Sequence, residues 1–70
     1  MEYLVVHCTQ KRSVRVDGVR QGETEDMLEL EAGTYIVTLD PANGCQPERH
    51  LVVLVNTTTI KPCEVAFAVA

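Results

Sequence analysis

Five side chains in this 70-residue sequence belong to the types that most often bind soft metals or act as nucleophiles: His7, Cys8, Cys45, His50 and Cys63. A zinc site needs about four such ligands converging at roughly 2.0 to 2.3 Å. The sequence has no Cys-x-x-Cys pair and no His-x-x-x-His pair. Neighbouring residues on a strand point to opposite faces, which would separate His7 from Cys8. We therefore expect no metal site, and we expect Cys8 to behave as a small buried apolar residue.

Cys45 and Cys63 lie beside turn-forming or proline residues, so they could approach each other as a disulfide or remain separate thiols. A cysteine nucleophile would need an adjacent base, for which His50 and His7 are the candidates. The spacing gives no support to such a pair. A small thiol-dependent redox or metal-handling protein that uses Cys45, Cys63 and His50 is nevertheless one of the functions we compare.

Signatures of catalysis and of cofactor binding are otherwise missing from the sequence. It has no glycine-rich phosphate loop and no serine in a strained strand-to-helix turn. The acidic run from Glu23 to Glu31 lacks the alternating ligands and the glycine of a calcium loop. We expect a protein that is not an enzyme, with no catalytic, cofactor-binding or metal-binding residues and no cofactor.

The composition favours one small domain spanning residues 1–70, with an aliphatic core, since only three residues are aromatic. The formal net charge of −4 argues against nucleic acid as a partner, because phosphate binding needs a basic face. No run approaches the roughly 20 apolar residues of a membrane helix, so we expect no membrane insertion and a soluble chain. The amino terminus lacks a secretion signal, and three cysteines cannot form a closed set of disulfides. We expect a cytoplasmic protein, or a cell-envelope one if the chain is a piece of a longer polypeptide.

Alternation of apolar and polar residues predicts about seven short strands and no helix. The class expected is all-β, a small antiparallel β-sandwich. Asp17-Gly18 supplies a tight hairpin turn, and the segment from Asp40 to Pro47, including Asn43-Gly44, is expected to be a surface loop. The best-specified element should be a hairpin that joins Met27–Glu31 to Thr34–Leu39 through Ala32-Gly33. The other strands are expected at Tyr3–Cys8, Arg12–Val16, Val19–Gln21, His50–Val55 and Glu64–Ala70.

Two of these strands should present apolar surface in different ways. His50–Val55 is continuously apolar, which indicates cover on both faces, or cover on one face and pairing with another molecule on the other. In the last strand, Val65, Phe67 and Val69 should share one face, and Ala66, Ala68 and Ala70 the other, where small side chains allow close approach.

Charge is unevenly distributed, with a basic segment over residues 11–20 followed by an acidic one over residues 23–31. The simplest interpretation is that adjacent strands place opposite charges across from each other on a solvated face. The alternative is a docking surface for an oppositely charged partner.

Val14-Arg15-Val16-Asp17-Gly18, Gly22-Glu23-Thr24 and the stretch from Leu28 to Val37 resemble the PEGA domain family, and the resemblance covers most of the chain. Glu25 and Ala32 depart from the family pattern, as does Cys45-Gln46 where a tyrosine step is usual. The positions that match its turn and strand motifs are Asp17-Gly18, Gly22, Thr24, Gly33, Tyr35, Gly44 and Pro47. The resemblance implies a small β-sandwich related to transthyretin-like and carboxypeptidase-regulatory-like modules, usually attached to bacterial envelope or signalling proteins. It implies protein or carbohydrate partners and carries no catalytic residue.

The function that we favour from the sequence is therefore a non-catalytic interaction module. Its strand edges or loops would bind a protein partner or a glycan, because unpaired edge groups allow a partner to add a strand. Self-association into a homo-oligomer through edge strands would use the same groups.

Overall fold

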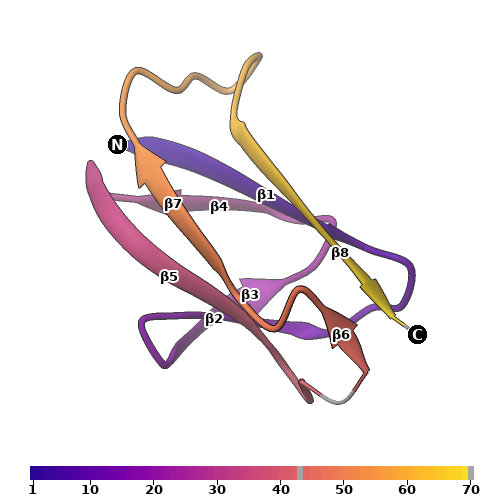
Figure 1. Cartoon of the computed structure of the whole chain (residues 1–70). Helices are drawn as coiled ribbons and strands as arrows, with labels where there is room; N and C mark the ends of the chain where they lie inside the picture. The colour runs from indigo at the N-terminus through magenta and orange to yellow at the C-terminus, as the bar shows by residue number, and fades with distance from the viewer. Residues whose placement is uncertain (43, 70) are drawn as a thin grey trace.

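The computed structural model describes residues 1–42 and 44–69, and these residues form eight strands in two four-stranded sheets (Figure 1). The first sheet has the order β4-β1-β8-β6 and consists of β4 (Met27–Leu30), β1 (Glu2–Cys8), β8 (Cys63–Val69) and β6 (Cys45–Gln46). The second has the order β3-β2-β5-β7 and consists of β3 (Val19–Glu23), β2 (Ser13–Val16), β5 (Gly33–Asp40) and β7 (His50–Leu54). The predicted all-β sandwich is confirmed, with one strand more than expected.

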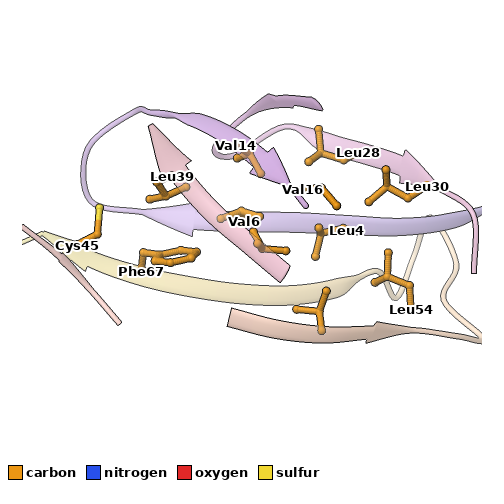
Figure 2. Close-up of a cluster of buried hydrophobic side chains, with 12 residues drawn as sticks. Leu4, Val6, Val14, Val16, Leu28, Leu30, Leu39, Cys45, Leu54 and Phe67 are labelled. Carbon is orange, nitrogen blue, oxygen red and sulfur yellow. The ribbon is translucent and has the colours of Figure 1, made fainter. Parts of the chain in front are cut away.

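The core lies between the two sheets and is aliphatic except for Phe67 and Cys45 (Figure 2). Its members alternate with exposed residues along each strand, because successive side chains of a strand point to opposite faces. Each fully buried aliphatic side chain stabilises the fold by roughly 1.5 to 3 kcal/mol. The buried apolar residues are Leu4, Val6, Val14, Val16, Leu28, Leu30, Val37, Leu39, Cys45, Val52, Leu54 and Phe67.

The tight turn predicted at Asp17-Gly18 is confirmed and joins β2 to β3. Asp17 and Gly18 have φ angles of 51° and 83°, the left-handed conformations that suit the twist of a two-residue hairpin. Two hydrogen bonds with Ile36 on β5 also hold the turn in place. The Asp17 amide donates to the carbonyl of Ile36 at 2.8 Å, and the Asp17 carboxylate accepts from the Ile36 amide at 2.9 Å. The turn residues thereby position the adjacent strand β5.

The hairpin predicted between Met27–Glu31 and Thr34–Leu39 is wrong. β4 pairs with β1, so that Glu29 lies opposite Tyr3, whereas β5 pairs with β2 and β7 in the other sheet. Ala32-Gly33 is therefore a corner between the layers. The Tyr35 hydroxyl donates to the carbonyl of Glu31 at 2.7 Å and stabilises this corner. Strand alternation and a turn glycine are compatible with either connection, which is why the local pattern could not distinguish them.

The order of the strands differs from the expected one in two further respects. The first and last strands are neighbours and run parallel, with Val6 opposite Val65, so the sandwich is not wholly antiparallel. The segment predicted as a loop from Asp40 to Pro47 contains β6, whose Cys45 pairs with Val69. The Asn43-Gly44 turn prediction falls partly on Asn43, which lies outside the described residues.

The expected two-faced pattern of the last strand is observed. Phe67 is buried, Val65 and Val69 pack against the core, and Ala66 and Ala68 are exposed. Ala70 lies outside the described residues. No helix in residues 1–42 and 44–69 is long and apolar enough to cross a membrane.

Candidate functional site: the open edge of β7

The three cysteines are free thiols and do not converge. Cys45 is buried on β6, opposite Val69 at the end of β8, whereas Cys63 lies at the start of that strand. At about 3.3 Å per residue, this separation is roughly 20 Å along β8. A disulfide requires Cα atoms within about 7 Å. The Cys45–Cys63 bridge considered from the sequence does not form in this fold. Cys8 is half-buried and packs against the core, close to the expectation of a buried apolar residue.

Cys63 and His50 are not placed as a nucleophile and its base. Burial raises the pKa of the Cys63 thiol, and the neighbouring Glu64 charge acts in the same direction, so the thiolate is disfavoured. The His50 Nε2 lies 2.7 Å from the carbonyl oxygen of Ala66. The His50 ring also packs edge-on against Phe67, with 4.7 Å between centroids. His50 thus links β7 to β8 across the side of the sandwich.

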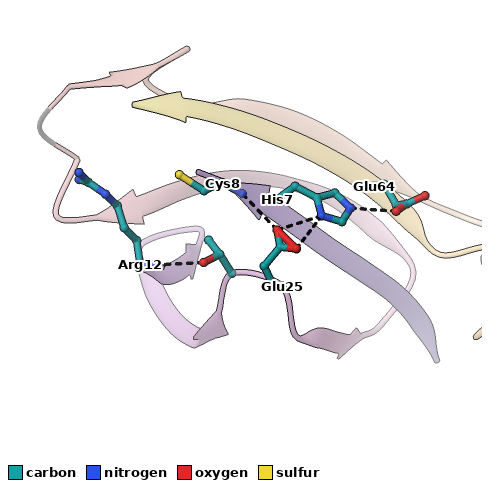
Figure 3. Close-up of polar contacts among 6 residues, drawn as sticks. His7, Cys8, Arg12, Glu25 and Glu64 are labelled. Atoms are coloured by element: carbon teal, nitrogen blue, oxygen red, sulfur yellow. Dashed lines mark hydrogen bonds and ion pairs between the residues drawn. The ribbon is translucent and has the colours of Figure 1, made fainter. Parts of the chain in front are cut away.

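His7 forms a charged cluster with two glutamates that sequence reasoning missed (Figure 3). Its Nδ1 lies 3.0 Å from Oε1 of Glu25, and its Nε2 lies 2.8 Å from Oε1 of Glu64. The hydrogen bond to Glu64 and then that to Glu25 raise the pKa of His7. The three residues come from β1, the loop after β3, and β8, so no local sequence signal could have assembled them.

The His7 cluster forms a brace between β1, the loop after β3 and β8. Its two carboxylates bind different nitrogens on the imidazole ring and do not face a common point with it. Across residues 1–42 and 44–69, no group of three or more histidine, cysteine or acidic side chains is arranged to hold a metal ion. Glu25 also accepts from the Cys8 amide at 3.3 Å, so its side chain fastens the loop to β1.

The basic and acidic segments do not simply neutralise each other across neighbouring strands. Lys11 and Glu23 are 3.9 Å apart, as the solvated-face interpretation expects. Arg15, however, lies opposite Arg20, which corrects that expectation. Glu29 of the acidic segment belongs to the other sheet, where it is exposed on β4. The outer face of the β3-β2-β5-β7 sheet therefore carries arginines close to one another.

An apolar patch adjoins these arginines on the same outer face. It consists of Ile36, Leu51 and Val53, and is called the β7 patch below. Leu51 is 71% exposed, Val53 is 61% exposed and Ile36 is 44% exposed. Leu51 lies directly opposite Ile36 in the pairing of β5 with β7. The inner side chains of β7, Val52 and Leu54, are buried. Of the two sequence alternatives for this strand, the structure shows cover on one face only.

β7 is also an edge strand. One edge pairs with β5, and the opposite edge pairs with no other strand in the described part of the chain. Proteins commonly protect such edges with proline, lysine or a bulge. Residues 50–54 contain neither proline nor lysine, and their pairing with β5 runs without a register shift. Unpaired backbone groups and exposed apolar side chains thus occur together on β7.

A depression of about 610 Å³ lies at the amino-terminal end of β7. It is lined by Thr38, Gln46, Glu48 and Arg49, among others. Arg49 immediately precedes β7, is exposed, and makes no ion pair with any residue of 1–42 or 44–69. Three features therefore lie next to one another at β7. They are its open edge, the β7 patch, and Arg49 at its amino-terminal end, which has no acidic partner among these residues.

Comparisons with protein-family models, with curated protein sequences and with solved structures found no match to this chain. The resemblance to the PEGA family stays a prediction. The candidate site rests on the geometry of β7.

Proposed function

We propose that this protein is a non-catalytic interaction module that binds an extended segment of a partner protein along the free edge of β7. The observation that carries the proposal is the coincidence of an open strand edge with the exposed Leu51 and Val53. Strand addition provides main-chain hydrogen bonds for affinity, and alternate side chains provide selectivity. The resemblance of the sequence to the PEGA family also implies a protein or carbohydrate partner.

The two other classes of function have less support. A redox or metal-handling role would need Cys45, Cys63 and His50 to act together. The fold places Cys45, on β6, beside the end of β8 at Val69, whereas Cys63 lies at the start of β8. A glycan partner would be favoured by exposed aromatic faces. Phe67 is buried, and Tyr3 and Tyr35 are only half-exposed, with the Tyr35 hydroxyl bonded to Glu31.

The test begins with selection of nine-residue peptides from a randomised display library, with the full chain as target. The selected peptides are then measured against a Leu51→Lys, Val53→Lys double variant. Both positions are exposed, so the variant should fold normally, because surface substitutions usually change stability by no more than about 0.5 kcal/mol. Binding should be lost, because two lysines replace apolar contacts at the edge.

The matched control is Val19→Lys, a comparably exposed apolar residue on β3 at the far edge of the same sheet. It should leave peptide binding unchanged. The proposal is contradicted if no peptide is enriched over background, or if the double variant binds the selected peptides as well as the unmodified chain does.

A further inference from the structure

We infer that the β7 edge selects an antiparallel partner segment in which two apolar residues at alternate positions are followed, two positions later, by an acidic residue that lies beside Arg49. The inference rests on the proposed function and adds to it the chemistry of the partner. It follows from the order of side chains along β7 and from the charge at one end of that strand.

The apolar part of the preferred segment follows from strand geometry. A strand added to β7 places its side chains alternately on the two faces of the sheet. Those on the outer face would lie opposite Leu51 and Val53, with Ile36 beside them on β5. Cross-strand pairs of apolar side chains stabilise a sheet by roughly 0.2 to 1 kcal/mol each. Two apolar residues at alternate positions therefore match the β7 patch.

The acidic part follows from Arg49. Antiparallel pairing is slightly more stable per residue than parallel pairing, and an antiparallel strand runs in the opposite direction to β7, so its carboxyl-terminal end reaches residue 49 and the adjoining depression. Arg15, on the same sheet, already has an acidic partner, since its Nη2 lies 3.0 Å from Oδ2 of Asp40. Arg49 has no such partner in the described part of the chain. A carboxylate from outside would supply the complementary charge.

Glu48 lines the same depression and should partly weaken the preference for an acidic residue. Its charge would repel an incoming carboxylate, which makes it a useful second probe. If the preference arises from charge at this end of β7, removal of the Glu48 charge must strengthen the binding of an acidic segment. Reversal of the Arg49 charge must weaken it.

A second copy of this chain that pairs through its own β7 matches the edge less well. Antiparallel pairing of β7 with itself about Val52 places Arg49 opposite Val55 of the other copy, so Arg49 again lacks an acidic partner. A partner segment with an acidic residue satisfies both the patch and the arginine. Self-pairing is accordingly an outcome that the test distinguishes.

The experiment uses four synthetic peptides with blocked termini and fluorescence anisotropy. The first has the pattern Val-Thr-Val-Thr-Glu, flanked by polar residues. The second and third carry Gln or Lys in place of Glu, and the fourth has Glu at the amino-terminal end of the pattern. Exposed ion pairs contribute up to about 1 kcal/mol, so the Glu peptide should bind roughly three- to fivefold more tightly than the Gln peptide and about tenfold more tightly than the Lys peptide. Added salt should reduce both differences.

Three variants of the chain complete the test. Arg49→Glu should make the Lys peptide bind more tightly than the Glu peptide. Glu48→Gln should strengthen binding of the Glu peptide, and Val53→Lys should weaken binding of all four peptides. The inference is overturned if all four peptides bind equally and Arg49→Glu changes nothing, or if the reversed pattern binds best. It is also overturned if the chain forms a dimer that Val53→Lys dissociates and Arg49→Glu leaves intact. If instead no peptide binds, or Val53→Lys has no effect, the proposed function itself fails.

Discussion

At the scale of single residues, the Asp17-Gly18 turn is formed by neighbours in the chain, whereas the His7 cluster joins residues that are far apart in it. Asp17-Gly18 was predicted as a tight turn because both residues tolerate positive φ, and this is a local property. The His7 cluster could not be predicted, because Glu25 and Glu64 are 18 and 57 residues from His7 in the chain. Such contacts depend on the register of strands that only the complete fold establishes.

The His7 cluster leads to a prediction about protonation. The hydrogen bonds that His7 donates to Glu64 and Glu25 should raise the pKa of His7 above its ordinary value of 6.5. Glu64→Gln removes the larger of these causes and should lower the His7 pKa. NMR titration of the imidazole resonances measures both values. Glu29→Gln, a change on the neighbouring strand β4, is the control and should leave the His7 pKa in place. An unaltered pKa in Glu64→Gln would contradict the arrangement.

At the scale of elements, alternation predicted most of the strands but not their partners. Met27–Leu30 and Gly33–Asp40 lie close to the predicted ranges, yet they belong to different sheets. The short connection at Ala32-Gly33 is equally consistent with a hairpin and with a corner, and the Tyr35 hydroxyl bond that marks the corner is a tertiary detail. The candidate site was anticipated only as one of two alternatives for an apolar strand, the one with cover on a single face. Its position at a sheet edge required the topology.

Substitutions on the two faces of β7 should change the free energy of unfolding by very different amounts. Leu54 is fully buried, so Leu54→Ala should reduce the free energy of unfolding by about 2 to 5 kcal/mol through lost contacts and a cavity. Leu51 is largely exposed, so Leu51→Ala should change that free energy by less than about 0.5 kcal/mol. Urea unfolding followed by far-UV circular dichroism compares the two. Equal losses would mean that the described orientation of β7 is incorrect.

At the scale of the whole molecule, Glu2 and His7 fasten β1 to distant parts of the chain. The fold shifts the pKa values of these two residues in opposite directions. The Glu2 carboxylate accepts from the Thr57 amide at 2.8 Å and from its hydroxyl at 2.7 Å, and these bonds lower the Glu2 pKa. His7, at the other end of the strand, has a raised pKa. Each shift makes the stability of the fold depend on pH.

The signs of these two dependences define a range of greatest stability. The contribution of Glu2 is present above its ordinary pKa of 4.5 and is lost as the pH falls through the lower pKa of the folded state. The contribution of His7 is present below its ordinary pKa of 6.5 and is lost as the pH rises through the higher pKa of the folded state. For these two groups, the free energy of unfolding should be greatest between pH 4.5 and 6.5.

Urea unfolding across a pH series measures this profile. His7→Gln should flatten its alkaline side and Glu2→Gln its acidic side, while each variant leaves the other side unchanged. If His7→Gln left the alkaline decline intact, the brace between β1, β8 and the loop after β3 would not contribute to stability.

Amide hydrogen exchange of the full chain, with and without a selected peptide, shows whether a partner segment binds as an added strand on β7. Amides of residues 50–54 that point away from β5 should exchange freely in the isolated chain and become protected in the complex. The β3 and β4 edges should be unaffected, because they lie elsewhere in the two sheets. Protection confined to the β3 or β4 edge or to the loops, with β7 unchanged, would mean that the peptide does not bind as a strand on β7.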